Sequence, residues 1–345
     1  MKNLYLLLFL VALISGTTNT FGQNTAPQLV TPGATPEAKE LYVYINSISG
    51  RQTMAGQHSV PLLGGARLSE VYRVAHEYPA VFGQDFGFSF PGDWDGINYR
   101  QNLVDEAIRR NSEGFIITLM WHAVPPTMDE PVSFKEAIQS QLTDAQWNEL
   151  VTPGTHLNEK WQSQVDVIAF FLKQLQYAHV PVLWRPYHEM NGGWFWWGKK
   201  KGDNGYKKLY KMLYDRLVNF HGLKNLVWVY NTNEFKPGVD RLDEYYPGDD
   251  LVDIITTDVY TQGFDQENYD QIIKLAGNKP VALGEVGTIP TPEILQKQPR
   301  WTWFMFWGDP GGPSFQTYRS EQVIKLKDLP WVKVKDPRMF YPVIK

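Results

Sequence analysis

Short apolar runs and segments of helical periodicity alternate along most of this 345-residue chain. Eight runs are rich in β-branched or aromatic residues and are typical of strands. They cover residues 52–58, 80–85, 114–122, 180–189, 226–231, 252–260, 280–286 and 303–308. Most segments between them place apolar residues three or four positions apart, which predicts helices at 68–76, 99–110, 161–177, 206–221 and 268–276. The runs are mostly continuous rather than alternating, as expected of parallel strands buried on both faces.

Eight strands that alternate with helices predict an α/β fold of the (β/α)8 TIM-barrel type, formed by a single domain. The alternative is an open, doubly wound sheet, but no glycine-rich first turn supports it. One segment, residues 123–160, is a long insertion with several prolines after the third strand. In a barrel this loop lies on the catalytic face.

The N-terminus predicts export. Lys2 is followed by an almost unbroken apolar stretch at residues 4–14 and a small, polar stretch at 15–22. We interpret residues 1–22 as a signal peptide, 23–36 as a flexible leader and 37–345 as the barrel. A buried N-terminal strand or helix is the alternative for the apolar stretch.

Cysteine is absent from the sequence, which excludes disulfides, thiolate metal sites and a cysteine-borne lipid anchor. We therefore expect an exported protein without a membrane anchor, periplasmic or else secreted, and monomeric. The net charge is −4, and the sequence shows no stripe of basic residues that could follow a phosphate backbone. We therefore expect no nucleic-acid partner.

Polar and aromatic residues gather at the predicted C-terminal ends of the strands, where TIM barrels carry their reactive groups. They are Gln57, His58, Asp85, Trp121, His122, His188, Glu189, Asn231, Asp258, Tyr260, Glu285 and Trp307. Glu189 ends the fourth strand and Glu285 the seventh, nearly opposite across the barrel. Two facing carboxylates within an aromatic rim indicate glycoside hydrolysis, in which one is protonated and the other ionised.

The same segment has other interpretations. The His188–Glu189 pair resembles the start of the zinc motif H-E-x-x-H, but the second histidine is missing. We expect no metal and no cofactor. A structural ion pair is the alternative role for each glutamate.

The motif "RPYHEMNGGWFWWG", with "GEVG" and "WFMFWG" further along, resembles glycoside hydrolase family 26. Most members of that family are β-mannanases, retaining enzymes with a (β/α)8 barrel, and the resemblance covers essentially the whole mature chain. The resemblance is to a secreted, Bacteroides-like member of the family.

The resemblance implies roles for individual residues. Glu189 is expected to be the acid/base, Glu285 the nucleophile and Tyr260 the residue that orients the nucleophile. The expected substrate-binding residues are His122, His188, Trp194, Trp307, Trp303 and Asn231. Trp194 would be the platform on the leaving-group side. Trp307, or else Trp303, would form the floor under the attacked sugar.

Several residues keep two interpretations. We interpret Trp121, Trp184 and Trp228 as core residues, because they lie within predicted strands. Trp196 and Trp197 either form part of the cleft wall or pack inside the protein. Arg185 needs a buried partner, for which Asp85 and Asp258 are the candidates. Asp93 and Asp95 either bind sugar hydroxyls or, as we prefer, cap a turn.

The predicted function is retaining hydrolysis of β-1,4-mannosidic bonds in mannan or manno-oligosaccharides. Release of mannobiose from a chain end is slightly favoured over internal cleavage, with loops 59–67, 90–98 and 123–160 as the means of closing one end of the cleft. The alternatives are a relative that acts on mixed-linkage β-glucan or β-xylan, and a non-catalytic glycan-binding barrel.

Overall fold

Eight parallel strands close into a barrel in the computed structural model, which describes residues 27–261, 263–311 and 313–333. The strands are β1 (Thr53–His58), β2 (Val81–Phe86), β3 (Ile116–Trp121), β4 (Val182–Pro186), β5 (Leu226–Asn233), β6 (Ile254–Val259), β7 (Val281–Val286) and β8 (Trp301–Phe306). Each pairs with the next, and β8 returns to β1, so the predicted (β/α)8 barrel is confirmed. Every residue of these strands is buried, which explains their continuous apolar runs.

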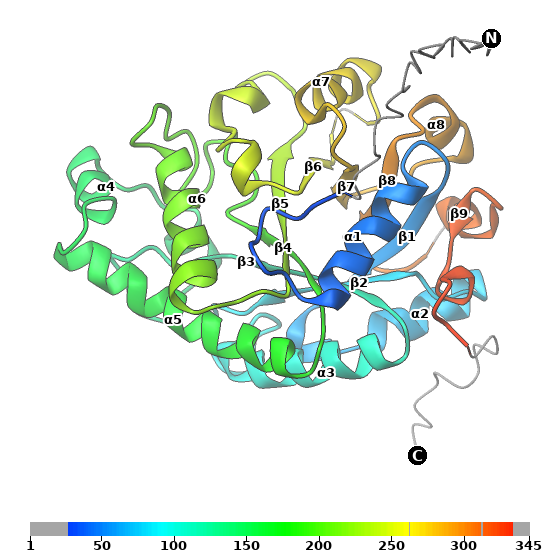
Figure 1. Ribbon diagram of the computed structural model, residues 1–345, viewed down its shortest axis with the longest axis horizontal. Coiled ribbons are helices and arrows are strands. Elements are labelled where there is room, and N and C mark those ends of the chain that lie inside the picture. Colours follow the sequence, from blue (N-terminus) through cyan, green and yellow to red (C-terminus); the bar gives the residue numbers. More distant parts are fainter. Residues whose placement is uncertain (1–26, 262, 312, 334–345) are drawn as a thin grey trace, which may run out of the picture.

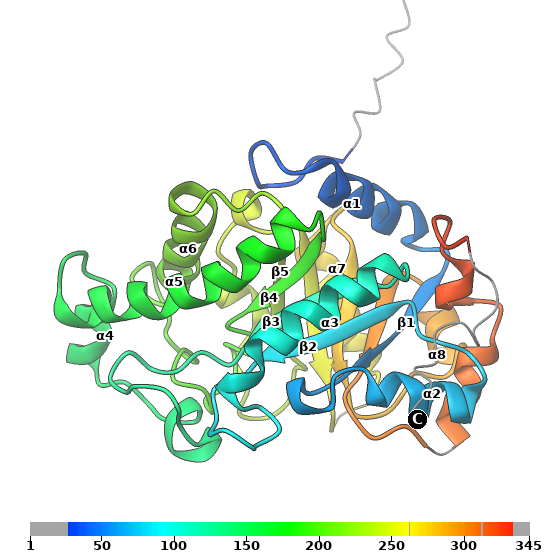
Figure 2. The same ribbon diagram turned by 90° about the horizontal axis from the view of Figure 1, so that it is seen from below.

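Helices cover the outside of the barrel (Figure 1). The predicted helices correspond to α2 (Ala66–Ala75), α3 (Arg100–Ser112), α5 (His156–Tyr177), α6 (Tyr206–Tyr214) and α7 (Gln266–Ala276). Figure 2 shows α3 and α5 along one side of the strands. Their buried residues, such as Leu103, Ala107, Val165 and Leu172, recur at three- or four-residue spacing.

The remaining elements lack a strong periodic signal. They are α4 (Asp144–Leu150), α8 (Pro292–Lys297) and a short strand β9 (Val323–Ile324) beside β1. Within residues 234–253, between β5 and β6, the chain forms only two 3₁₀ turns, Leu242–Tyr245 and Asp249–Leu251. The insertion after β3 contains α4, which packs against the start of α5.

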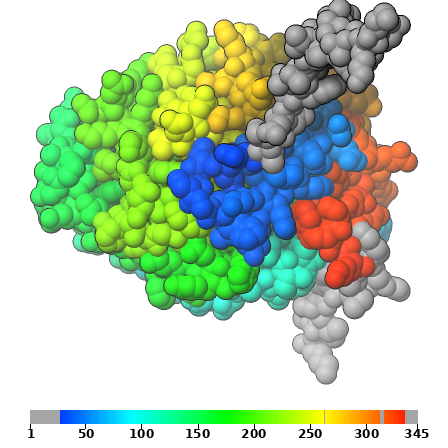
Figure 3. Space-filling model, viewed as in Figure 1, coloured from blue at the N-terminus to red at the C-terminus, as the bar shows by residue number. Residues whose placement is uncertain are grey.

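The N-terminal segment of the described chain packs against the barrel. Helix α1 (Pro36–Ile48) lies across the face in view in Figure 3 and buries Leu41, Tyr42 and Ile45. Ahead of it, Val30 N donates a 2.7 Å hydrogen bond to Asp253 Oδ1, and Thr35 caps the helix. Hydrogen bonds from Val30 and Thr35 therefore tie residues 30–36, the last part of the predicted leader, to the barrel. The predicted signal peptide, residues 1–22, lies outside the described residues.

No helix within the described ranges combines the length and the apolar character that a membrane crossing requires.

Candidate active site

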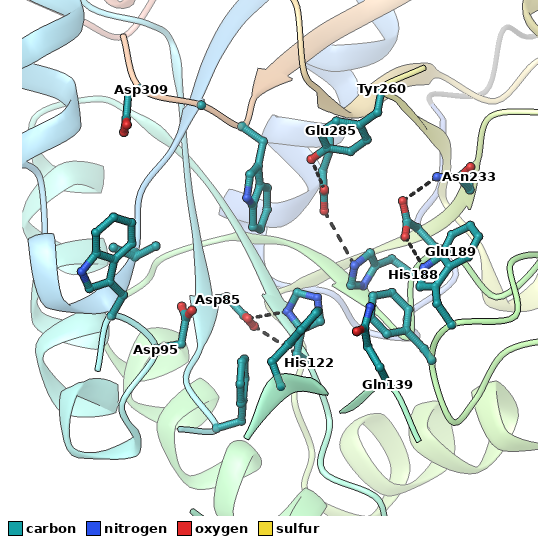
Figure 4. A pocket seen from close by; sticks show the side chains of 18 of the residues that line it. Asp85, Asp95, His122, Gln139, His188, Glu189, Asn233, Tyr260, Glu285 and Asp309 are labelled. Carbon is teal, nitrogen blue, oxygen red and sulfur yellow. Dashed lines mark hydrogen bonds and ion pairs between the residues drawn. The ribbon is translucent and has the colours of Figure 1, made fainter. Parts of the chain in front are cut away.

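A cleft of about 800 Å³ opens at the C-terminal ends of the strands (Figure 4). Its lining brings together most of the predicted rim residues and several from the loops. These are Val60, Arg67, Asp85, Phe88, Trp94, Asp95, His122, Phe134, Gln139, His188, Glu189, Trp194, Phe195, Asn233, Lys236, Tyr260, Glu285, Trp307, Gly308 and Asp309. Its position matches the face on which TIM barrels carry their active sites.

The chain turns sharply where β4 delivers Glu189 to the cleft. The strand ends at Pro186, three residues earlier than the predicted run, and both Tyr187 and Glu189 have positive φ angles, 48° and 55°. Non-glycine residues rarely adopt this conformation, and such strain is concentrated at functional sites. A hydrogen bond from Glu189 N to Asn231 O, 2.9 Å long, holds the turn against β5.

Glu285 is held by two donors at the end of β7. Tyr260 OH donates to Oε2 at 2.6 Å, and Arg185 Nη2 donates to Oε1 at 2.5 Å. Arg185 also lies 3.4 Å from Asp258, so its partners are Glu285 and Asp258 rather than Asp85. The arrangement aims a buried carboxylate into the cleft and supplies a positive charge beside it.

Glu189 has different surroundings. Burial, followed by the nearby charge of Glu285, raises the pKa of Glu189 to about 7. Hydrogen bonds from Asn233 Nδ2 to Oε1 and from Trp194 Nε1 to Oε2, both 2.6 Å long, act in the opposite direction. Glu189 can therefore hold a proton near neutral pH, as a general acid must.

Two histidines in edge-to-face contact, with ring centres 4.6 Å apart, lie beside the carboxylates. His122 Nδ1 is 2.6 Å from Asp85 Oδ2. Burial alone would lower the pKa of His122, but the Asp85 carboxylate raises it overall. Burial and the positive charges of His122 and Arg185 lower the pKa of His188 well below its usual range. The pKa values of the two imidazoles are thus shifted in opposite directions, and Asp85 is the partner of His122.

Aromatic side chains form the walls. Trp194 and Trp307 line the cleft, and the Trp307 ring stacks on His58 with centres 3.4 Å apart. Phe134 and Phe195 face His122. Flat apolar surfaces of this kind suit the C–H faces of pyranose rings.

Two predicted binding residues do not line the cleft. Trp303 lies within β8, four residues before Trp307, which directly follows the strand. Trp303 is therefore roughly 13 Å deeper in the barrel and is 2% exposed. Asn231 is fully buried and donates to Asp258 Oδ2 at 2.8 Å. Strand β5 continues two residues beyond its predicted end, so Asn233 takes the rim position on that face.

Sequence reasoning missed Asn233, Lys236 and Gln139 in the lining. Period-two alternation from Asn231 could have identified Asn233, whereas nothing local marks the other two. Asp95 lines the cleft, while Asp93 accepts a hydrogen bond from Ser89 within a turn. Burial, followed by the charge of Asp85, raises the pKa of Asp95 to about 6.

Burial shows that Trp196 and Trp197 do not form part of the cleft wall. Trp196 and Trp197 are buried and donate their indole N–H groups to Ala123 O and His188 O, both at 2.7 Å. They are packing residues that support the loop. Trp121, Trp184 and Trp228 are core residues, as predicted.

One group in the described part of the chain has the spacing of a metal site: His188, Glu189 and Asp258, whose ligand atoms lie within 4.8 Å of one another. The Glu189 oxygens already accept two hydrogen bonds, and Arg185 places a positive charge beside Asp258. Because that charge opposes a cation, the donor set fits a metal poorly.

Comparisons with known proteins agree on one family. The model of "Glycosyl hydrolase family 26" matches residues 30–337. The structure of GH26A from Muricauda sp. is 43% identical, with a TM-score of 0.83 over 87% of this chain and 99% of that one.

Curated relatives carry the name mannan endo-1,4-beta-mannosidase. One from Thermothelomyces thermophilus is 37% identical over 81% of this chain and 56% of its own length, and one from Bacillus subtilis strain 168 is 34% identical over 74% and 73%. The chain spans about half the length of the first curated relatives that it matches. The family match, together with the two carboxylates at the ends of β4 and β7, shows that this chain belongs to glycosyl hydrolase family 26.

Proposed function

We propose that the chain hydrolyses β-1,4-mannosidic bonds in mannan or manno-oligosaccharides with retention of anomeric configuration. The observation that carries this proposal is the unlike surroundings of Glu189 and Glu285. Glu189 has a pKa raised to about 7, whereas Glu285 is paired with Arg185 and Tyr260. The relatives named mannan endo-1,4-beta-mannosidase support mannan as the substrate.

The geometry supports a two-step reaction. In the first step Glu189 transfers its proton to the glycosidic oxygen, the bond from that oxygen to the anomeric carbon breaks, and a Glu285 oxygen bonds to the carbon. In the second step Glu189, now ionised, takes a proton from water. The water oxygen bonds to the anomeric carbon, and Glu285 leaves as a carboxylate.

The test is hydrolysis by the purified chain of mannan, glucomannan, lichenan and xylan, with Glu285→Ala as the inactive control. We expect reducing sugar from the first two polymers, and a β-anomer as the first product in proton NMR. Activity confined to lichenan or xylan would support the glucan or xylan alternative. Binding without cleavage would support a glycan-binding barrel, which the presence of both supported carboxylates disfavours.

We further propose that mannobiose is released from a chain end. Arg67 and Asp309, from the loops after β1 and β8, form a 3.1 Å ion pair at the cleft wall. Leu62 N donates to Trp94 O at 3.2 Å, which joins the loop after β1 to the loop after β2. These contacts would close one end of the cleft, so that binding energy sets the position of the chain end. Mannobiose accumulating from soluble mannan while viscosity hardly changes would support this, whereas a ladder of products with an early fall in viscosity would contradict it.

We also propose that residues 1–22 direct export to the periplasm, or to the medium, and that the mature protein is a monomer. The positive start and apolar stretch support export. Cell fractionation, N-terminal sequencing and light scattering test the three parts.

A further inference from the structure

Both oxygens of the Glu189 carboxylate accept hydrogen bonds, one from Asn233 and one from Trp194. Both bonds favour the ionised carboxylate. The bond-breaking step in the proposed function instead needs a proton on one of these oxygens, directed at the glycosidic oxygen. The oxygen that carries this proton becomes a poor acceptor, so one of the two hydrogen bonds must be given up.

Asn233 is the donor that the fold holds firmly. It is 3% exposed, at the end of β5. Its backbone N donates to Asn191 Oδ1 at 2.8 Å, and Asn191 Nδ2 donates back to Asn233 O at 3.0 Å. This reciprocal pair fixes the backbone of Asn233, and burial confines its side-chain amide beside Glu189.

Trp194 is the donor that can move. It is partly exposed in the cleft wall and follows two glycines. A Cβ atom at Gly192 would lie 2.2 Å from the indole ring, so the missing side chain leaves space for the ring. Lys236 Nζ lies 5.9 Å from the ring centre on the same side of the cleft. A sugar that packs on Trp194 therefore contacts the donor of one hydrogen bond directly.

We propose that a sugar bound on the leaving-group side displaces the Trp194 N–H from Glu189 Oε2 and so frees this oxygen to carry the catalytic proton, while Asn233 keeps Oε1 in place. Trp194 is then both sugar platform and switch, and Asn233 is a positioning residue. The inference rests on the proposed glycosidase function and adds a regulatory step within it.

The charged and titratable groups around this carboxylate come from several elements. They are Glu285 on β7, Arg185 and His188 on or after β4, Asp258 and Tyr260 on or after β6, His122 after β3, and Lys236 after β5. The two hydrogen bonds can be altered without changing any of these charges, which makes neutral substitutions the suitable test.

The first experiment compares pH profiles on mannotetraose. The profile of kcat/KM reports the free enzyme and that of kcat the bound enzyme. In the wild type we expect the basic limb of the kcat profile to lie about one pH unit above the basic limb of the kcat/KM profile. The reason is that sugar binding removes the hydrogen bond from Trp194 to the ionised Glu189, and this raises the pKa of Glu189. Trp194→Phe should raise the kcat/KM limb by about one unit to meet the kcat limb. Asn233→Ala should raise both limbs.

The matched control is Asn268→Ala. Asn268 is 5% exposed, and its Oδ1 accepts a hydrogen bond from Phe235 N at 3.2 Å. It therefore anchors the loop that follows Asn233 but makes no hydrogen bond to Glu189. Both limbs should stay in place in this variant. Coincident limbs in the wild type, or an unmoved kcat/KM limb in Trp194→Phe, would overturn the switch.

A second readout does not depend on turnover. The Glu189 carboxyl can be titrated by carbon-13 NMR and assigned by its loss in Glu189→Gln. We expect its pKa to be about one unit higher in Trp194→Phe than in the wild type. Equal pKa values would contradict the inference even if mannan is cleaved. Higher values in an enzyme that leaves mannan intact would contradict only the proposed function.

Discussion

The hydroxyl of Tyr260 lies 2.6 Å from Oε2 of Glu285 and donates a hydrogen bond to it. Tyr260 follows β6 and Glu285 lies in β7, so two neighbouring strands bring donor and acceptor together. Gly287 makes the contact possible, because a Cβ atom there would lie 2.8 Å from the tyrosine ring. The bond fixes one oxygen of Glu285 and leaves the other to Arg185.

Removing this hydroxyl should slow the reaction without unfolding the protein. In Tyr260→Phe we expect kcat to fall by roughly 10- to 100-fold with little change in KM, since a hydrogen bond to a charged group contributes about 1.5–3 kcal/mol. Steady-state kinetics on mannotetraose measure the effect. Tyr318→Phe is the control, because it removes a buried hydroxyl that bonds to Gly56 O away from the cleft. An unchanged kcat in Tyr260→Phe would show that Tyr260 does not orient the nucleophile.

The two glutamates should respond differently to the leaving group. Glu189→Ala should lose about 10²–10⁴-fold on manno-oligosaccharides but far less on activated aryl glycosides, which need no proton. Glu285→Ala should lose nearly all turnover on both. Rates with both substrate types in each variant measure this. Equal losses in the two variants would contradict the division of roles.

The raised pKa of Glu189 predicts how activity depends on pH. The first step needs protonated Glu189, so kcat/KM, which reports the free enzyme, should decline as pH rises through about 7. Initial rates between pH 5 and 9 measure the limb. A rate that stays constant to pH 9 would assign the proton to another group.

The same pKa predicts a stability effect with a definite sign. The pKa of this carboxyl is higher in the folded protein than in the unfolded chain, where it is about 4.3. Its contribution to the free energy of unfolding is therefore fully present below about pH 4.3, and it is lost as the pH rises through the pKa of the folded protein. Glu189→Gln should therefore stabilise the protein at pH 8, by up to roughly 3 kcal/mol, and hardly at all at pH 4. Thermal unfolding at the two pH values tests this, and a destabilised variant at pH 8 would contradict it.

Chelation should leave activity unchanged. A ring nitrogen of His188 and carboxylate oxygens of Glu189 and Asp258 lie close enough together to hold a cation. The positive charge of Arg185 beside Asp258, however, opposes cation binding. We expect equal rates on mannan before and after dialysis against EDTA. A loss that is restored by a divalent cation would contradict the prediction that no metal is needed.

The sequence by itself determined the barrel and its two carboxylates. Buried parallel strands need continuous apolar runs, and surface helices need a three- to four-residue period, so both types of element are recorded locally. Strand ends then identified Glu189, Tyr260 and Glu285, because parallel strands place their ends on one rim. The helices that were not predicted include α4, which is only seven residues long, and α1, although its buried residues Leu41, Tyr42, Ile45 and Ile48 follow that period.

Only the tertiary structure decided which groups meet. The partners of Arg185 depend on how β4, β6 and β7 are staggered around the barrel, and pairing across strands leaves no local trace. Trp303 and Trp307 look alike in sequence, yet their depth separates a buried residue from a cleft wall. Asn233 reached Glu189 because β5 runs two residues beyond its apolar run, where backbone pairing with β6, rather than side-chain hydrophobicity, extends the strand.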